Sequence, residues 1–220
     1  MTDRALKKLN KTIPEGLPRL GELCLTCVAR RKSGKTTLLC KLVKAYAKAM
    51  NLVICLSPTV RLDKTWKQIE HLPNVLTGEN VTNEVIMEII RVQKERYLQD
   101  PSSHLLLILD DAGNDMRRKK LRQSVNVLYT TARHYGINLI CSVQSLMHLE
   151  GTQITNSSQW AIWDTNQRQL KKICVDLSTS HMDEDDLQRF IIDNTKAKYS
   201  HVWINFLEDD DRMFQTKVPL

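Results

Sequence analysis

The stretch from Glu22 to Leu39 constrains the fold of this chain more than any other part of the sequence. Its first part, ELCLTCVA, has the length and apolar character of a β-strand and contains β-branched residues. A basic turn follows and ends in Gly34-Lys35-Thr36, after which apolar residues recur at helical spacing. A strand, a tight turn and a helix in this order form the context that a phosphate-binding loop requires.

The chemistry of such a loop follows from the start of its helix. A helix that begins near Gly34 leaves its first N–H groups without partners, at the positive end of the helix dipole. These groups can hold a β-phosphate, Lys35 can reach the β and γ oxygens, and Thr36 can ligate Mg²⁺. The residues predicted to bind ATP are Ala29, Arg30, Arg31, Lys32, Ser33, Gly34, Lys35, Thr36 and Thr37.

One position departs from the general pattern of these loops. The pattern has a glycine six positions before the lysine, where this chain has Ala29. Alanine keeps the side chain small but loses the freedom to adopt a positive φ. The alternative is a Gly-Lys-Thr that occurs by chance in a basic chain, which the flanking strand and helix disfavour.

The rest of the chain alternates between predicted strands and predicted helices. Further strands are predicted at 52–56, 74–76, 104–111, 137–143, 160–163 and 199–206. Helices are predicted at 82–99, 117–136, 167–175 and 183–193. The alternation predicts an α/β fold with a mainly parallel central sheet flanked by helices. Together with the phosphate loop, the expected fold class is a P-loop NTPase (ASCE/RecA-like). The predicted domain is 21–206, between a basic N-terminal arm (1–20) and a C-terminal tail (207–220).

Two carboxylates end the apolar run HLLLILDD, which fits a central strand covered on both faces. We expect Asp110 to hold Mg²⁺ through its water ligands, and Asp111 to orient the attacking water or accept its proton. Most ATPases of this type have Glu at the second position, so the shorter Asp requires a closer water or a relay through a second one. The alternative is a polar turn after a strand.

Gln144 and Arg133 complete the candidate catalytic set. Gln144 follows the strand 137–143 and could hydrogen-bond the water or the γ-phosphate; the alternative is a polar strand end. Arg133 could neutralise charge in the phosphoryl-transfer transition state, in cis or in trans. It could instead simply favour the C-terminus of its helix. Arg30, Arg31 and Lys32 are rivals that could act on the phosphates in cis.

The charge of the chain favours a polyanionic partner. The net charge is +7 and the isoelectric point is near 9.1. The helix after the carboxylates begins with a cationic cluster, either a solvated face or a contact to DNA phosphates: Arg117, Arg118, Lys119, Lys120 and Arg122. Residues 1–20 are read as an arm that contacts DNA or a neighbouring subunit, or as a solvated tail.

Neither a secretory signal nor an apolar run of membrane-spanning length occurs in the sequence, which predicts an intracellular protein without stable membrane insertion. The six cysteines lie mostly in apolar segments and are interpreted as reduced core residues. Cys24 and Cys27 have a zinc-like spacing, but no second pair completes a site, and the two thiols would point to opposite faces of a strand.

Three segments resemble a known family, the poxvirus-type viral DNA-packaging ATPases of the FtsK–HerA class of P-loop NTPases. They are VARRKSGKTTLL (28–39), LLLILDD (105–111) and RHYGINLICSVQ (133–144). The resemblance implies a ring, pentameric or hexameric, that hydrolyses ATP with Mg²⁺ at subunit interfaces. It implies translocation of double-stranded DNA into a preformed capsid, with capsid vertex proteins as further partners. The expected location is the host cytoplasm or viral factory, or the virion.

Two other functions remain open at this point. A P-loop nucleoside or nucleotide kinase would need a lid and a base-binding pocket, and the sequence has no arginine-rich lid. A DNA-binding module that binds nucleotide without motor activity would need neither Asp111 nor Gln144. ATPase activity measured with and without duplex DNA separates these alternatives.

Overall fold

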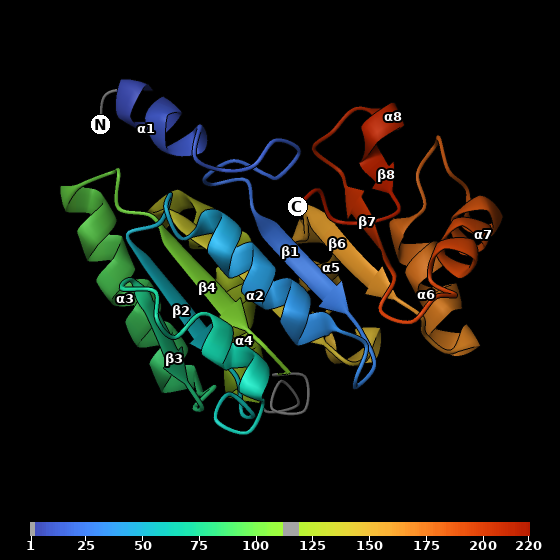
Figure 1. The fold of residues 1–220 in the computed structure, drawn as a ribbon, viewed down its shortest axis with the longest axis horizontal. Helices are drawn as coiled ribbons and strands as arrows, with labels where there is room; N and C mark the ends of the chain where they lie inside the picture. The colour runs from blue at the N-terminus through green and yellow to red at the C-terminus, as the bar shows by residue number, and fades with distance from the viewer. Residues whose placement is uncertain (1–2, 112–118) are drawn as a thin grey trace.

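A computed structural model describes residues 3–111 and 119–220, which form an α/β fold around one eight-stranded sheet (Figure 1). The strand order is β3-β2-β4-β5-β1-β6-β7-β8. The strands are β1 (Cys24–Val28), β2 (Leu52–Leu56), β3 (Val75–Gly78), β4 (Leu105–Leu109), β5 (Ile137–Val143), β6 (Gln159–Trp163), β7 (His201–Asn205) and β8 (Phe214–Gln215). The helices are α1 (Asp3–Asn10), α2 (Lys35–Tyr46), α3 (Asn83–Gln99), α4 (Lys119–Thr131), α5 (Gly151–Asn156), α6 (Gln167–Leu177), α7 (Glu184–Asn194) and α8 (Asp210–Met213). Short 3-10 helices are η1 (Lys64–Gln68), η3 (Ala132–Tyr135) and η4 (Leu146–His148).

The centre of the sheet is parallel, as predicted. All five residues of β4 are buried, because β4 pairs in parallel with β2 on one side and β5 on the other while helices cover both faces. A continuous apolar run is the pattern that such a doubly covered strand requires. The predicted fold class, with a mainly parallel sheet flanked by helices, is therefore confirmed.

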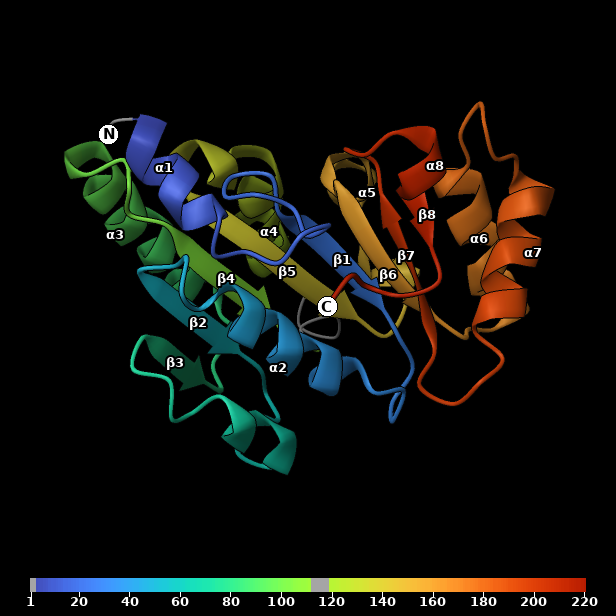
Figure 2. The ribbon, with the colours of Figure 1, turned by 45° about the horizontal axis from the view of Figure 1, so that its top comes forward.

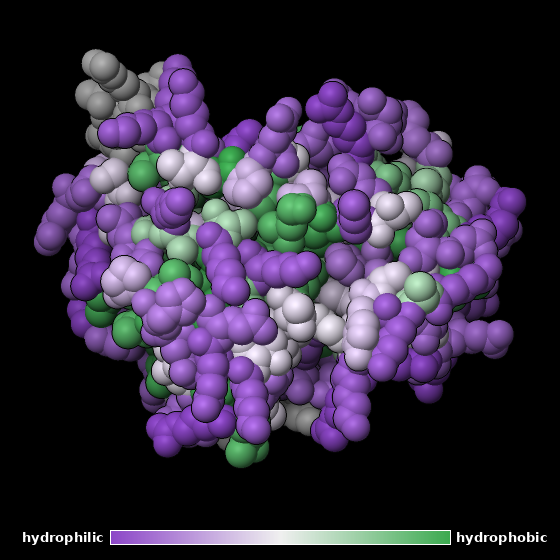
Figure 3. Space-filling view, viewed as in Figure 1, coloured by the Kyte–Doolittle hydropathy of each residue, from purple (hydrophilic) through white to green (hydrophobic). Residues whose placement is uncertain are grey.

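Two hydrophobic clusters, one on each face, hold the helices to the sheet. One cluster joins the sheet to residues of α3, α4, α6 and α7, and the other joins it to α2, η1 and the N-terminal segment. The turned view shows these two layers on either side of the strands (Figure 2). In the space-filling view, the face over α2 presents mainly hydrophilic side chains with small apolar patches, so the core is largely closed on this face (Figure 3).

The last third of the chain adds two antiparallel strands. β7 runs antiparallel to β6, and Trp163 pairs with His201, so β7 begins where β6 ends. The predicted late strand at 199–206 is thus present. β8 extends the sheet from within the segment predicted as a C-terminal tail, and it was not predicted. The domain boundaries themselves stay predictions.

The segment after α1 packs against the body of the fold. Ile13, Leu17 and Leu20 are buried in the same cluster as α2. The Tyr46 hydroxyl donates a hydrogen bond to the Pro18 carbonyl at 2.8 Å. A solvated tail is therefore wrong for this part of the chain, whose apolar side chains complete the core beside α2.

The helix predicted at 117–136 differs from the structure at its end. α4 stops at Thr131, and η3 continues to Gly136, whose φ of 67° ends the helical course in the left-handed region. The predicted loop 112–116, together with Arg117 and Arg118 of the cationic cluster, lies outside the described residues.

Candidate nucleotide-binding site

One cavity lies beyond the carboxyl ends of β1, β4 and β5, where a parallel sheet of this kind binds its ligands. Its volume is about 780 Å³. It is lined by Arg30, Arg31, Lys32, Ser33, Gly34, Lys35, Thr36, Thr37, Thr59, Leu62, Asp63, Thr65, Asp110, Asp111, Gln144, Lys198 and Tyr199. The structure thus brings the predicted phosphate loop, both carboxylates and Gln144 to one place, with Ala29 buried directly before the loop.

The phosphate loop has the geometry of an anion site. Gly34 caps α2 with a φ of 90°, and within the described residues this N-cap makes no side-chain hydrogen bond. The free N–H groups and the helix dipole therefore favour a negative group here. The Ser33 hydroxyl oxygen is buried and has no hydrogen-bond partner in the described part of the chain. A phosphate oxygen would satisfy this hydroxyl.

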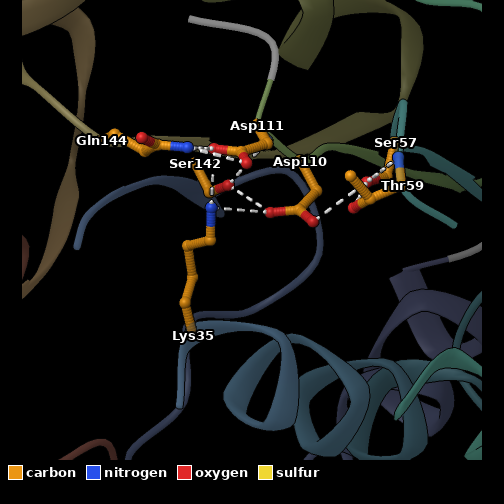
Figure 4. A network of polar contacts seen from close by, with 7 residues as sticks. All are labelled: Lys35, Ser57, Thr59, Asp110, Asp111, Ser142 and Gln144. Carbon is orange, nitrogen blue, oxygen red and sulfur yellow. Dashed lines mark hydrogen bonds and ion pairs between the residues drawn. The ribbon is translucent and has the colours of Figure 1, made fainter. Parts of the chain in front are cut away.

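Lys35 connects the loop to the carboxylates (Figure 4). Its Nζ lies 3.1 Å from Asp110 Oδ1 and 3.2 Å from Asp111 Oδ1. Burial lowers the pKa of Lys35, but the two carboxylates outweigh burial, so its pKa lies above the usual range. The ammonium is therefore charged at neutral pH and lies where the terminal phosphate of a nucleotide would meet both carboxylates.

Asp110 is fixed by two serine hydroxyls. Ser142 Oγ donates to Asp110 Oδ1, and Ser57 Oγ donates to Asp110 Oδ2 at 3.1 Å. Ser57 directly follows β2, and Ser142 lies near the end of β5; these two strands flank β4 on either side. Asp110 is 2 % exposed, so both its position and its direction are set by the fold. The sequence prediction missed both serines.

Asp111 is held by a different set of contacts. Gln144 Nε2 donates to Asp111 Oδ1 at 2.8 Å and to Oδ2 at 2.9 Å. The amide of Asp111 donates to Ser142 Oγ at 3.1 Å, so one hydroxyl links the two carboxylates. The Asp111 side chain is 25 % exposed, which leaves it accessible from the cavity.

Backbone strain is concentrated around this cavity. Among the described residues, three that are not glycine have a positive φ: Lys32 at 62°, Asp111 at 57° and Tyr199 at 70°. All three line the cavity. Each costs about 1–2 kcal/mol, and such strain persists at functional sites. Ala29 is not among them, which explains why this loop needs no glycine at that position.

The oxygen donors in the cavity fit a magnesium ion. Thr36 and Asp110 are the predicted ligand positions, and a third carboxylate, Asp63, lines the same cavity. Burial raises the pKa of Asp63, but hydrogen bonds from Thr65 and Thr36 together lower it by more than burial raises it. The pKa of Asp63 therefore lies below the usual range. Mg²⁺ takes few protein ligands and keeps waters and phosphate oxygens, which matches this sparse set. The sequence prediction missed Asp63.

Arg133 does not belong to this cavity. It is exposed in η3, directly before β5, and it lines a separate cavity with Cys24 and Ile137 at the amino ends of the strands. β5 has seven residues, which span roughly 23 Å between Arg133 and the edge where Gln144 lies. Of its predicted rivals, Arg30, Arg31 and Lys32 do line the nucleotide cavity, and Arg30 also lies 3.5 Å from Asp164.

Fold and site together define a P-loop NTPase: a parallel α/β sheet with a phosphate loop after one strand and an Asp pair after another. The family model described as "Poxvirus A32 protein" matches residues 21–210. The chain belongs to this family. No curated protein matches it.

Several solved structures share the fold. The genome-packaging NTPase B204 of Sulfolobus turreted icosahedral virus 2, in complex with ATP-gammaS, is 16 % identical, with a TM-score of 0.65 over 91 % of this chain and 98 % of that one. The conjugation coupling protein TcpA of pCW3 is 12 % identical, with a TM-score of 0.66 over 92 % of this chain and 62 % of that one. The cytoplasmic domain of the type VII secretion ATPase EccC of Thermomonospora curvata is 15 % identical, with a TM-score of 0.64 over 88 % of this chain and 25 % of that one.

Two other predictions from the sequence concern membrane-spanning segments and the state of the cysteines. Within 3–111 and 119–220, no helix combines the length and the apolar character needed to span a membrane. Five of the six cysteines are buried, and Cys24 is partly buried. Cys24 and Cys27 belong to opposite hydrophobic clusters, as their spacing predicted. Burial raises the pKa of Cys24 to about 12.

Proposed function

We propose that this protein is a Mg²⁺-dependent ATPase that translocates double-stranded DNA during viral genome packaging. The family supports a packaging role, and the network of Lys35, Asp110, Asp111 and Gln144 is the observation that supports hydrolysis. A site that only stored nucleotide would not require a second carboxylate oriented by an amide beside the lysine.

The chain's own residues have distinct roles in the proposed reaction. The loop N–H groups and Lys35 hold the β- and γ-phosphates. Asp111, oriented by Gln144, positions the attacking water and accepts its proton. Thr36 and Asp110 would hold Mg²⁺, which when bound neutralises charge on the phosphate oxygens.

We propose that Arg133 acts in trans. It lies at the amino edge of the sheet, which is the side where the parallel strands begin, and the phosphates bound by its own subunit lie out of reach at the opposite, carboxyl edge, where these strands end. An exposed arginine at the amino edge can serve the cavity of a neighbouring subunit in a ring of five or six copies. Charge stabilisation by such an arginine accelerates phosphoryl transfer by about 10³–10⁵.

DNA is the proposed polyanion. The net charge is +7, and α4 begins with exposed Lys119 and Lys120 shortly after the catalytic carboxylates in sequence. Arg122 is partly engaged, with its Nε 2.6 Å from Glu150 Oε1. Because α4 follows Asp111 in the chain, contacts of its basic end with DNA phosphates would be coupled to the hydrolytic site. We place the motor at a capsid vertex in the cytoplasm or viral factory.

The first test is ATP hydrolysis with and without duplex DNA. We expect Mg²⁺-dependent turnover that duplex DNA stimulates, and no turnover for Lys35→Ala. Phosphate transfer to a nucleoside or nucleotide in place of water would instead assign a kinase. ATP binding without turnover under any of these conditions would assign a binding module.

A second measurement tests the DNA partner. Binding through backbone phosphates should weaken with salt, with a log–log slope of about −0.9 for each phosphate neutralised, and should show little sequence preference. The double variant Lys119→Ala/Lys120→Ala should make this slope shallower by the amount that corresponds to the loss of one or two phosphate contacts. A salt-insensitive complex would contradict the proposal.

A further inference from the structure

A second cavity adjoins the phosphate loop on the side away from the carboxylates. Its volume is about 460 Å³, and one wall is the phosphate loop from Arg30 to Ser33. The opposite wall is the turn 195–200 that leads into β7. Figure 2 shows the connection between α7 and β7 extending beside the loop that follows β1. Lys198 and Tyr199 line both this cavity and the nucleotide cavity, so the two are continuous.

The position of this cavity follows from the sheet order. Asp110, Asp111 and Gln144 follow β4 and β5, which lie on one side of β1. They define where the terminal phosphate lies. β6 and β7 lie on the other side of β1, and β7 begins at the carboxyl end of β6 because the two are antiparallel. A nucleotide whose triphosphate crosses the loop therefore directs its base toward the 195–200 turn.

Tyr199 is the aromatic side chain at this junction. A Cβ built on Gly34 would lie 3.2 Å from Tyr199 Cδ1 and 3.6 Å from its Cγ, so the ring lies against the phosphate loop. Tyr199 is nevertheless 57 % exposed, and its backbone has a φ of 70°. The Lys198 ammonium lies 4.8 Å from the ring centroid. Packing alone poorly explains an exposed aromatic ring that lies beside a phosphate site and belongs to a residue with a strained backbone.

We propose that Tyr199 is the stacking platform for the base of the bound nucleotide, in the cavity between the phosphate loop and the 195–200 turn. This inference rests on the proposed function and adds the part of the site that holds the nucleoside. Stacking uses the π-face that every base has, so ATP and GTP should both bind. Lys198, whose ammonium lies over the ring, adds a positive charge to the same part of the cavity. Tyr199 is thus a positioning residue and does not touch the reacting atoms.

The test compares ligands with and without a base. Equilibrium binding of ATP, GTP and inorganic tripolyphosphate is measured for the wild type, Tyr199→Ala and Tyr199→Phe. We expect Tyr199→Ala to bind both nucleotides about 10- to 100-fold more weakly, as loss of one stacked base predicts. Its tripolyphosphate affinity should stay within twofold of the wild type. Tyr199→Phe should bind all three ligands like the wild type, because the ring remains.

Controls separate the possible outcomes. Tyr135 also lies beneath a lysine, with Lys94 Nζ 5.2 Å from the centroid of its ring, but it lies at the opposite edge of the sheet. Tyr135→Ala is therefore the matched control, and it should leave ligand binding unchanged. If Tyr199→Ala weakens the binding of ATP and of tripolyphosphate equally, Tyr199 only supports Gly34. If nucleotide binding is unchanged, Tyr199 does not stack on the base. Either outcome overturns the inference. If the wild type binds neither ATP nor tripolyphosphate, the proposed function itself fails.

Discussion

The two edges of the central sheet hold buried polar groups of different kinds. At the amino edge, where the parallel strands begin, two of the groups are neutral amides that pair with the backbone, Asn138 and Gln93. Asn138 accepts from the Gly21 N–H at 2.8 Å and donates to the Leu105 carbonyl at 3.3 Å. Gln93 donates to two further carbonyls, at 2.6 and 3.1 Å. These side chains satisfy backbone groups where the strands begin, and their role is structural.

At the carboxyl edge, where the parallel strands end, charged groups are buried beside the neutral serines Ser57 and Ser142. Asp110 is 2 % exposed and Lys35 is 9 % exposed, and both lie near Asp111. The Ser33 hydroxyl of the phosphate loop is also buried at this edge, without a hydrogen-bond partner among the described residues. Such charges are costly to bury unless they are paired. The comparison shows how one sheet separates two tasks: neutral amides hold its beginning together, while its end concentrates charge that a phosphate and a cation can engage.

The largest expected effect tests Arg133, which lies at the amino edge but is proposed to act at the carboxyl edge of a neighbour. Arg133→Ala should lower turnover by about 10³–10⁵ while ATP binding survives. Mixing Arg133→Ala with Asp111→Asn subunits should restore activity, because some interfaces then combine an intact Asp111 with an intact arginine. ATPase activity of the mixture is the measurement.

The control for this experiment is Arg96→Ala, an exposed arginine on α3, which should keep full turnover. Native mass spectrometry verifies that the two inactive variants assemble together. If mixed rings form and tolerate inactive neighbours but no activity returns, the trans role of Arg133 is wrong.

The next effect separates the two carboxylates. Asp111→Asn should bind ATP but lose about 10²–10⁴ in turnover, because an amide cannot accept the proton of the attacking water. Asp110→Asn should instead weaken nucleotide binding in the presence of Mg²⁺, because the ion loses a charged partner. Titration of Mg²⁺ against ATP binding distinguishes the variants. Normal hydrolysis by Asp111→Asn would assign the proton acceptor elsewhere, with Asp63 the next residue to test.

Much of this carboxyl edge could be predicted from the sequence. The strands 52–56 and 137–143 match β2 and β5 because both are buried apolar runs, and β4 lies within the run before Asp110. Lys35, Asp110, Asp111 and Gln144 converge because parallel strands end at one edge. The same logic sends the helix after β4 back to the start of β5, which is why Arg133 lies far from its own site.

The residues that were missed depend on spatial order, which periodicity does not reveal. Ser57 and Ser142 look like ordinary polar residues at strand ends, and only the order β2-β4-β5 places them on either side of Asp110. Asp63 and Tyr199 lie in loops whose courses are set by tertiary packing. β8 has two residues and carries no pattern at all.

A smaller effect is expected from the neutral amides of the amino edge. Asn138 is fully buried, so Asn138→Ala should lower the free energy of unfolding by about 1–3 kcal/mol, because the Gly21 N–H and the Leu105 carbonyl lose their partner. Asn51→Ala is the matched control: Asn51 also accepts a backbone N–H, but it is exposed and water can replace it. Urea unfolding measures both. Lost ATP binding at unchanged stability would contradict the division of tasks between the edges.

The smallest effect concerns strain in the phosphate loop. Lys32 has a φ of 62°, so Lys32→Gly should be more stable than Lys32→Ala by about 1 kcal/mol, although both remove the charge. Thermal unfolding of the two variants gives the difference. If alanine is as stable as glycine at this position, the left-handed backbone of the loop carries no measurable cost.

The central place of β1 has a consequence for how the chain folds. The strand that carries the phosphate loop is made first, yet its neighbours β5 and β6 come much later; Thr26, for example, is hydrogen-bonded to Ser157, 131 residues away. Contacts at such separation form slowly, because a long loop has to close before they are made. During synthesis β1 therefore waits with both edges unpaired until most of the chain has left the ribosome. We expect the amides of β1 to gain hydrogen-exchange protection after those of β2 and β4, which makes ATP binding a late property of the nascent protein.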